Sequence, residues 1–420
     1  MLNDAVNSGD REMEEKTDVV IVGAGIAGLT LALELQKRSV STLLVDRRKG
    51  PDSVPRGITF QPNGLGALEQ IGILDRVQQM GSSERILEVR DWDHNLLLEA
   101  DYSVLDHSQN YIMTVNAVEV EQTLGYEAEK MGAKTLWSAG FEEILWKDGV
   151  AQGVRVNVEG EPADINASIV VGADGPQSRV RSMIGATART RKYADSFLVG
   201  MVGPVKELKD RARQYQAPGK MLGIMPAGPD ACYFFYCVGE RKFDDLKRQG
   251  VEQFRGEVTE AAPELEQAFG GVEAWTRIGY FTPSFIKVDS WVGNGVALLG
   301  DAAHTFHPHA GQGVNLSLQD ALALAEVIED AIKAGDTSAK RLATYQTSRK
   351  MFADVIGQHA HYTATYALSN NRLVKWLNKR ALRKMNKDRT LMKRALEITA
   401  GIFTEKPGLI EQARMGGILP

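Results

Sequence analysis

Several kinds of residue and segment are scarce or missing in this sequence. Only two cysteines, Cys232 and Cys237, occur among the 420 residues. They lie five apart in a segment typical of a strand, so they face opposite sides, and neither a disulfide nor a shared metal ion is expected. No apolar run is long enough to span a membrane, and the polar first sixteen residues lack the apolar core of a signal peptide. These absences favour a reducing cytoplasm, and we expect residues 1–16 to form a flexible tail.

A strong excess of charge of one sign is also missing. The chain has 49 Lys and Arg against 54 Asp and Glu, a formal net charge of −5. This balance argues against a general nucleic-acid binder. A chain of 420 residues is longer than a single core usually organises, so the sequence predicts two domains.

The most specific local signal lies between residues 17 and 46. An apolar strand over 18–22 leads into Gly23-Ala24-Gly25-Ile26-Ala27-Gly28, a helical segment over 29–37 and a second strand over 41–45 that ends at Asp46. In such a βαβ unit the glycines allow a tight turn, close approach of a pyrophosphate and close helix packing, while the acid suits a ribose diol. The pattern predicts a dinucleotide site. The alternative is a glycine-rich turn without a ligand, and this unit alone does not distinguish NAD from FAD.

Two further turns carry Gly and Asp directly after apolar strands. One is Gly172-Ala173-Asp174-Gly175-Pro176, whose simplest interpretation is a turn alone. The other is Gly300-Asp301, which continues through Pro308 and Gly311-Gln312-Gly313-Val314-Asn315 into a helical pattern over 316–332. A glycine-rich turn before a helix presents backbone amides to a polar ligand.

In this order and at these spacings, the three motifs resemble those of the single-component (group A) FAD-dependent aromatic hydroxylases with the para-hydroxybenzoate hydroxylase fold. The resemblance extends from about residue 17 to 400, and residues 366–400 are more weakly similar to ubiquinone-biosynthesis-type hydroxylases. It implies an α/β fold: a Rossmann-like FAD-binding domain, an inserted mixed β-sheet substrate domain and C-terminal helices. The implied boundaries are 17–75, 111–180 and 285–345 for the FAD-binding domain, 76–110 and 181–284 for the substrate domain, and 346–420 for the C-terminal helical region.

The resemblance also implies which residues hold FAD. The pyrophosphate would lie on the glycine run (Gly23, Gly25, Ile26, Ala27 and Gly28), and the adenosine ribose on Asp46. Other contacts would come from Arg47 and Arg56, from Asp174 and Gly175 near the pyrophosphate and the nicotinamide route, and from Asp301, after Gly300, on the ribityl chain. Backbone amides of Val314 and Asn315, after Gly311 and Gly313, would face the flavin N1, where a helix N-terminus stabilises the negative charge of reduced flavin.

One departure stands out. Members of this family usually carry an arginine just before the helix that here is expected over 118–131, but this chain has Asn116-Ala117. One pyrophosphate or flavin contact is therefore missing, which puts tight retention of FAD in question.

The resemblance further implies an NAD(P)H-dependent monooxygenase. NAD(P)H would be a transient co-substrate, and O₂ would form a C4a-hydroperoxyflavin that hydroxylates an aromatic or quinone-like small molecule. The chain has a single GxGxxG run, so no separate Rossmann domain for NAD(P)H is expected. One alternative is a flavin-dependent reductase or dehydrogenase, for example one that acts on an isoprenoid chain. Another is a non-catalytic FAD-binding protein. A flavin halogenase is disfavoured because the Trp-x-Trp-x-Ile-Pro segment of that class is missing.

The histidines of the third motif are candidates for chemistry. A metal site is disfavoured because no carboxylate accompanies them at a fixed spacing, so no metal is predicted. His304 is expected to be structural. His307, Pro308 and His309 are expected at the flavin edge, where a histidine is either a general base or proton relay, or a wall residue. His359 and His361 are two apart on a helix, share no face and are assigned no site.

The remaining segments suggest a sheet and a basic tail. Strands are predicted over 197–205, 221–226 and 231–238, forming a mixed sheet with residues 76–110. The aromatics at 233–236 alternate across two faces, for which core packing is the favoured interpretation and the lining of a substrate pocket the alternative. Between Arg372 and Arg394, ten Lys or Arg accompany one acid. This segment is either a helix docked on the FAD-binding domain with a solvated basic face, or a weak peripheral contact with an anionic membrane. We expect a monomer or homodimer.

Overall fold

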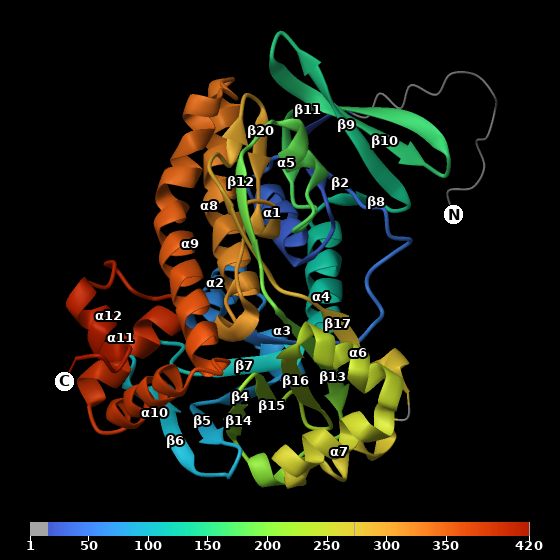
Figure 1. Cartoon of the computed structure of the whole chain (residues 1–420). Coiled ribbons are helices and arrows are strands. Elements are labelled where there is room, and N and C mark those ends of the chain that lie inside the picture. The colour runs from blue at the N-terminus through green and yellow to red at the C-terminus, as the bar shows by residue number, and fades with distance from the viewer. Residues whose placement is uncertain (1–15, 273, 420) are drawn as a thin grey trace.

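The computed structural model describes residues 16–272 and 274–419. Within these residues, two large β-sheets occupy opposite halves of the molecule, and long helices run between them (Figure 1). The tail expected over residues 1–16 lies outside the described residues, apart from Lys16, which begins the first strand.

The first large sheet has eight strands in the described chain. Its central parallel strands, over residues 16–22, 42–45 and 296–298, are mainly apolar and largely buried. Val19, Val20 and Ile21 of the first strand have no exposed surface. The strand order is β19 (Val292–Gly293), β20 (Val296–Leu298), β11 (Glu161–Gly172), β1 (Lys16–Val22), β2 (Thr42–Val45) and β8 (Lys134–Leu136), and β9 (Ala139–Lys147) and β10 (Val150–Val158) extend from β11.

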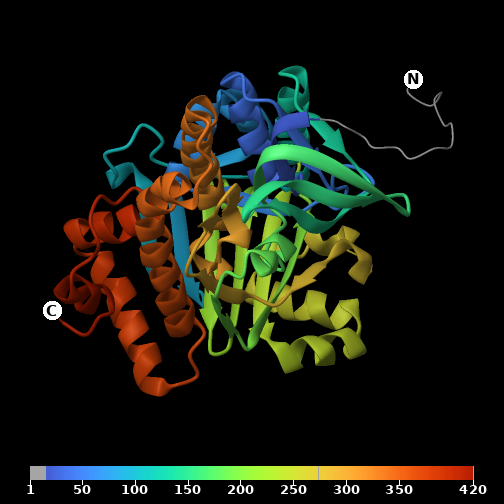
Figure 2. The same ribbon diagram turned by 90° about the horizontal axis from the view of Figure 1, so that it is seen from above.

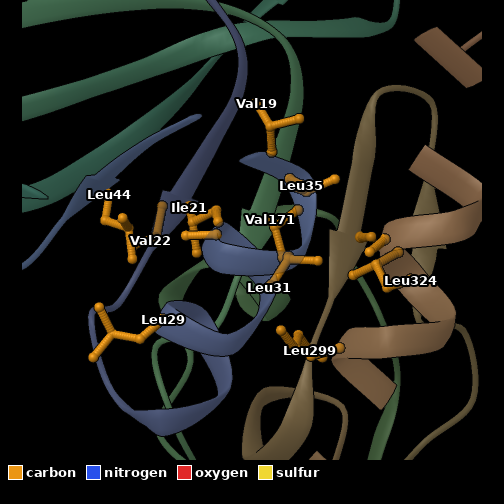
Figure 3. Packing of buried hydrophobic residues seen from close by; sticks show 14 of the residues in the cluster. Val19, Ile21, Val22, Leu29, Leu31, Leu35, Leu44, Val171, Leu299 and Leu324 are labelled. Atoms are coloured by element: carbon orange, nitrogen blue, oxygen red, sulfur yellow. The ribbon is translucent and has the colours of Figure 1, made fainter. Parts of the chain in front are cut away.

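Helix α1 (Ile26–Lys37) lies at the centre of this half. Residues Gly28 to Leu35 are all buried, because α1 packs between the sheet, α4 (Ala117–Lys130) and α8 (Gly313–Ala334). Figure 3 shows Leu31 and Leu35 of α1 beside Val171 of β11, with Leu299 and Leu324 completing the cluster. The glycine run that precedes α1 is therefore anchored by a large apolar core.

The second large sheet is mixed and has seven strands in the described chain. Two of them come from the segment before residue 110 and the others from 195–281, as the sequence predicted. Only the β14–β5 pair is parallel. The order is β17 (Gly279–Phe281), β13 (Asp195–Val202), β16 (Cys232–Gly239), β15 (Lys220–Pro226), β14 (Arg211–Ala217), β5 (Ile86–Asp91) and β6 (Leu96–Asp101).

Side chains of β16 alternate between the two faces of this sheet. Phe234 and Tyr236 join a core with α6 (Glu240–Gln249) and α7 (Val251–Ala261), whereas Tyr233 and Phe235 face the other half of the molecule. The two cysteines, Cys232 and Cys237, are buried, unpaired and in different clusters. The predicted alternation is confirmed.

Smaller elements join the two halves. One three-stranded sheet consists of β3 (Gly57–Phe60), β7 (Ile112–Asn116) and β4 (Ser82–Glu84), and another of β12 (Ala188–Lys192), β18 (Ser284–Val288) and β21 (His304–Thr305). The short helices beside them are α2 (Pro62–Ile71), α3 (Leu74–Met80) and α5 (Arg179–Met183).

Helix α9 (Ala339–Ala367) runs along α8 and contacts β19 of the first sheet (Figure 1). The other C-terminal helices gather at one side of the molecule, next to the second sheet (Figures 1 and 2): α10 (Arg372–Met385), α11 (Arg389–Thr399) and α12 (Leu409–Met415). The basic helix α10 docks on β6 and α9, with Lys379 2.9 Å from Asp91, rather than on the half that contains the first sheet. Leu373 and Trp376 on this helix remain 63% and 56% exposed. No helix in the described part of the chain is both long and apolar enough to cross a bilayer.

Candidate functional site

The glycine run before α1 is constrained at its two ends and open in the middle. Gly23 has φ +112°, and a Cβ there would lie 2.4 Å from the Ala173 carbonyl oxygen. A Cβ at Gly28 would lie 2.0 Å from the Gly23 carbonyl oxygen, so the protein's own packing requires both glycines. A Cβ at Gly25 would meet no protein atom within 4 Å. The bare backbone at Gly25 is thus not needed for packing and leaves room for a ligand.

The start of α1 offers an anion its unpaired amides. Gly25 is the N-cap and provides no side-chain hydrogen bond, and the first turn carries no acid. The amides of Ile26 and Ala27 therefore present the positive end of the helix dipole next to the open side of Gly25.

Asp46 lies at the end of β2, next to the glycine run. Its Oδ2 accepts a hydrogen bond from the Ala24 amide at 2.8 Å, and both of its oxygens accept hydrogen bonds from Arg48. Burial opposes ionisation, but these hydrogen bonds outweigh it and hold the pKa of Asp46 below its usual value. Asp46 is therefore a charged acceptor at the position that the sequence assigned to a ribose.

The arginines around Asp46 include one, Arg48, that the sequence analysis did not identify. Arg47 is exposed, whereas Arg48 turns inward and donates to the Ala24 carbonyl at 2.8 Å and to Glu121 at 2.7 Å. Arg56, which the sequence did identify, pairs with Asp52 and lies 4.0 Å from Glu121. Sequence reasoning missed Arg48, because nothing in two adjacent arginines says which one turns toward the glycine run.

The missing arginine has a structural counterpart. Ala117 is the first residue of α4 and is fully buried, and its amide donates to the Arg56 carbonyl at 2.8 Å. One turn later, Glu121 is only 3% exposed and faces Arg48 and Arg56. The start of α4 therefore presents Ala117 and the buried carboxylate of Glu121, at the position where the sequence comparison expects an arginine.

The second motif packs directly against the first. Asp174 caps α5 by accepting from the amides of Arg179 and Val180 at 2.7 and 3.2 Å, while its other oxygen is buried without a partner. Gly175 has φ +80°, a conformation that glycine adopts readily. Arg181 donates to the carbonyls of Pro176 and Ala302 and so joins this motif to the third one, a contact the sequence did not reveal.

The third motif packs against the start of α1. Gly300 has φ +59°, and a Cβ there would lie 2.7 Å from Ser317 Oγ and 3.4 Å from Ala27 Cβ. Asp301 is accessible to solvent, yet the surrounding protein desolvates it and raises its pKa. A Cβ at Gly313 would lie 4.0 Å from Asp301 Oδ1, so the acid stands beside the start of α8.

Helix α8 begins without a side-chain cap or an acid in its first turn. The side chain of Asn315 instead fixes the adjoining segments, since Oδ1 accepts from the Gln61 amide at 3.0 Å and Nδ2 donates to the carbonyls of Thr59 and Gly311 at 3.2 and 2.6 Å. Gly311 has φ +61° at the turn before the helix. The first amides of α8, those of Val314 and Asn315, remain available to a ligand.

His304 belongs to a buried charged group. Its Nε2 lies 2.6 Å from Asp320, and the other oxygen of Asp320 accepts from Arg349 Nε at 2.7 Å. These contacts tie the third motif to α8 and α9. Among the described residues, no group of three His, Cys, Asp or Glu side chains is arranged to hold a metal ion.

His307 has both ring nitrogens engaged. Its Nε2 lies 2.8 Å from Asp195 Oδ2, and its Nδ1 accepts from the His309 amide at 3.2 Å. The ring of Tyr193 packs edge-on at 4.7 Å, and its hydroxyl lies 3.2 Å from His361, which contacts Arg191 at the surface. Tyr193 and His361 thus lie between the buried His307 and the surface.

His309 differs from His307 in having an open ring nitrogen. Its Nδ1 is buried without a hydrogen-bond partner. Burial, with His307 and His359 nearby, lowers the pKa of His309 to about 3, so the ring is neutral at pH 7. His307, Pro308 and His309 form one short turn, and the sequence did not identify Asp195 and Tyr193, its partners more than a hundred residues away.

An aromatic face of the second sheet lies beside this loop. Phe197 is 5.6 Å from the His307 ring, 5.4 Å from Phe281 and 6.0 Å from Phe235, measured between ring centroids. Tyr233 packs against Gly57, whose added Cβ would lie 2.1 Å from its ring. The loop with His307 and His309 therefore borders an apolar, aromatic wall.

Comparison with known proteins decides the family. The sequence pattern of the family described as "FAD binding domain" matches residues 16–360. The chain belongs to this family. The 6-methylpretetramide 4-monooxygenase of Streptomyces rimosus is 27% identical over 344 residues, 80% of each chain, and the 3-demethoxyubiquinol 3-hydroxylase of Escherichia coli is 26% identical over 410 residues, 92% of this chain and 99% of that one.

A solved structure supports the same conclusion. The crystal structure of P. aeruginosa PqsL in complex with 2-aminobenzoylacetate matches with a TM-score of 0.77 and 25% identity, covering 86% of this chain and 99% of that chain. The predicted fold class is confirmed: a Rossmann-like FAD-binding unit of the para-hydroxybenzoate hydroxylase type with an inserted mixed sheet and C-terminal helices. The chain is an FAD-dependent monooxygenase, with NAD(P)H as its co-substrate.

Proposed function

We propose that this monooxygenase hydroxylates an electron-rich aromatic or quinone-like ring placed between His309 and the aromatic face of the second sheet. The observation that carries this placement is the buried, unpartnered Nδ1 of His309, at a loop bordered by Phe197 and its aromatic neighbours. A ring with a hydroxyl group would find an apolar wall for its faces and an acceptor for its proton.

We propose that FAD lies along the three motifs. The open backbone at Gly25 and the uncapped start of α1 favour a pyrophosphate there, held by Gly23, Ile26, Ala27 and Gly28. Asp46 would accept from the adenosine ribose, and Arg47, Arg48 and Arg56 would lie near the adenine and pyrophosphate. The unpartnered oxygen of Asp174, with Gly175, would face the middle of the cofactor, and Asp301, with Gly300, Gly311 and Gly313, would face the ribityl chain and flavin. The amides of Val314 and Asn315 would face the flavin N1.

The bound FAD supplies electron transfer from NAD(P)H and activation of O₂. The side chains of the loop hold and orient the substrate. His309, neutral at pH 7, accepts a hydrogen bond from a ring hydroxyl at Nδ1, which orients the ring and increases its electron density where oxygen is added. Asp195 fixes His307, whose Nδ1 in turn holds the His309 amide in place, and Pro308 fixes the turn between them. Tyr193 packs against His307 and contacts His361, on the side of the loop that faces the surface.

We also propose how the chain is divided between these tasks. The first sheet, with residues 17–75, 111–180 and 285–345, would hold FAD, and the second, with residues 76–110 and 181–284, would cover the substrate. This division is supported by the buried apolar clusters, because each of the two sheets has a cluster of its own. We propose a cytoplasmic monomer or homodimer.

A weak peripheral contact with an anionic membrane through residues 372–394 fits the exposed side chains of α10. Leu373 and Trp376 are more than half exposed, and Arg380 lies over the Trp376 ring at 5.5 Å. Three basic residues of this segment (Lys379, Lys393 and Arg394) are paired with acids, whereas the others have no ion pair among the described residues. Aromatic and basic side chains together suit a lipid interface. We expect the protein to sediment with phosphatidylglycerol vesicles, and we expect both added salt and Trp376→Ala to weaken this binding. Equal binding to neutral vesicles would exclude the electrostatic contact.

The proposed hydroxylation is tested by steady-state turnover. Purified protein with bound FAD is supplied with NADH or NADPH and a panel of phenols, quinolones and polyprenyl phenols, and consumption of the nucleotide and of O₂ is followed. We expect one panel class to stimulate both together. Nucleotide oxidation that is indifferent to O₂ and yields a saturated product would instead identify a reductase.

A further inference from the structure

A cavity of about 380 Å³ lies among the four C-terminal helices, outside the three glycine motifs. One wall is a single face of α9 that includes His359, Thr363 and Tyr366, spaced four and three residues apart. The opposite wall comes from α10, α11 and α12, with Ile398, Ala413 and Met415 among its residues. Its volume falls within the range of small-molecule sites, roughly 300–1,000 Å³.

The lining of this cavity is uncharged. Of the described residues that form it, none is Asp, Glu, Lys or Arg. Burial lowers the pKa of His359 to about 4, so this ring is neutral at pH 7, and its Nε2 lies 3.0 Å from the Thr399 hydroxyl. An ionised ligand would be buried here without a counter-charge, at a large cost in free energy, so the cavity selects a neutral, largely apolar ligand.

The cavity adjoins the loop that carries His309. His359 lines the cavity and lies close enough to His309 to contribute to its lowered pKa. His359 contacts Thr399, whose carbonyl accepts a hydrogen bond from Gln312 Nε2 at 2.6 Å. Gln312 directly precedes the first turn of α8. Leu316 of α8 belongs to the same apolar cluster as Val355 and Ile398, which line the cavity. The site of the ring and the cavity are therefore neighbours.

The outer side of the cavity carries exposed apolar side chains. Helix α12 has no buried residue, although it forms part of the wall, and Leu409 and Ile410 on it are 84% and 65% exposed. Ile418, which follows α12 and also lines the cavity, is 56% exposed. A long apolar chain would pass from this rim into the cavity without leaving apolar surroundings.

We propose that this cavity binds the neutral aliphatic or isoprenoid chain of the substrate whose ring is placed at His309. The position of the ring rests on the proposed function. Binding of a chain alone does not, because it requires neither flavin reduction nor O₂. The two ideas are therefore separable by experiment.

The test measures binding of straight-chain alcohols to the FAD-loaded protein by calorimetry, with 1-hexanol, 1-octanol and 1-decanol as probes. Each methylene that leaves water contributes about a fourfold gain in affinity, so we expect the dissociation constant to fall steeply with chain length until the cavity is filled. Thr363→Trp fills the cavity from α9 and is expected to weaken 1-decanol binding by roughly tenfold or more.

Thr365→Trp is the matched control, since Thr365 lies two residues along the same helix, is exposed, and makes the same kind of hydroxyl contact to the carbonyl four residues earlier. It is expected to bind 1-decanol as the unchanged protein does. Ala413→Phe fills the cavity from α12 and replaces Thr363→Trp if circular dichroism shows that variant to be misfolded. No gain with chain length, or equal binding by the filling and control variants, would overturn the proposal. Chain binding without any ring hydroxylation would leave the cavity assigned and the proposed function refuted.

Discussion

The glycine run and the histidine loop are both parts of the candidate site, but they are specified in different ways. The glycine run, Asp46 and the helix between them fall within thirty residues, and packing of this segment fixes their positions. The histidine loop acquires its character from distant residues: His307 contacts Asp195 across 112 positions, and the Tyr193 hydroxyl contacts His361 across 168. Local spacing therefore identifies a cofactor site, whereas substrate chemistry depends on tertiary contacts.

The largest effect is expected from substitutions in the glycine run. Gly28→Ala places a Cβ 2.0 Å from the Gly23 carbonyl, so α1 must shift, at a cost of about 1–3 kcal/mol in the free energy of unfolding, and FAD binding should be lost. Gly25→Ala meets no protein atom, so it should leave the stability of the FAD-free protein unchanged and weaken only FAD binding. Thermal unfolding and FAD titration of both variants check this. Normal FAD affinity in Gly25→Ala would place the pyrophosphate elsewhere.

The histidine loop is tested by removing the open nitrogen. His309→Leu is expected to lower kcat/KM by roughly tenfold, the scale of one lost hydrogen bond to the substrate, with FAD affinity unchanged. Asp195→Asn acts through His307 and should have a smaller effect, with a shifted pH profile, because Asp195 is a positioning residue. The measurements are kcat, KM and FAD titration across pH. If His309→Leu turns over normally, the histidine is a wall residue.

A smaller effect concerns the acid that faces the arginines. Glu121 is buried against Arg48 and close to Arg56, so its charge competes with an anionic pyrophosphate for both. Glu121→Gln should bind FAD several-fold more tightly, by the magnitude of a partly screened charge interaction. Glu129→Gln, the same charge change at the exposed end of α4, is the control and should have no effect. Weaker FAD binding in Glu121→Gln would show that the carboxylate instead positions Arg48.

The smallest effect is on stability against pH. The pKa values of His309 and His359 are lowered to about 3 and about 4, below the value of 6.5 for an ordinary histidine. As pH falls below 6.5 the unfolded chain binds protons that the folded one does not, so stability is present above 6.5 and is lost on acidification. The melting temperature should fall between pH 6.5 and 5, and His359→Gln should flatten this slope. A slope unchanged in that variant would show that His359 does not contribute.

Much of the molecule could be predicted from the sequence. β-Branched strands ending at glycine and aspartate predicted the first sheet, the three motifs and the FAD-binding family, because each signal lies within one strand-turn-helix unit. The inserted sheet and the alternation of Tyr233 to Tyr236 followed from period-two spacing.

The contacts between motifs could not be predicted. They depend on how distant segments of the chain meet. Examples are the inward turn of Arg48 rather than Arg47, the link that Arg181 makes between two motifs, and the contact of Asp195 with His307. The cavity among the C-terminal helices has no sequence signature, since its lining is ordinary apolar helix. The exposed positions of Leu373 and Trp376 likewise depend on where α10 docks.

The most direct test of the central claim is isotopic. The FAD-loaded protein is given NAD(P)H, ¹⁸O₂ and the panel compound that stimulates nucleotide oxidation, and the mass of the product is measured by mass spectrometry. The account predicts one ¹⁸O atom in the product, on the ring, for each NAD(P)H consumed in coupled turnover. A product without ¹⁸O, or one that gains hydrogen instead of oxygen, would contradict it.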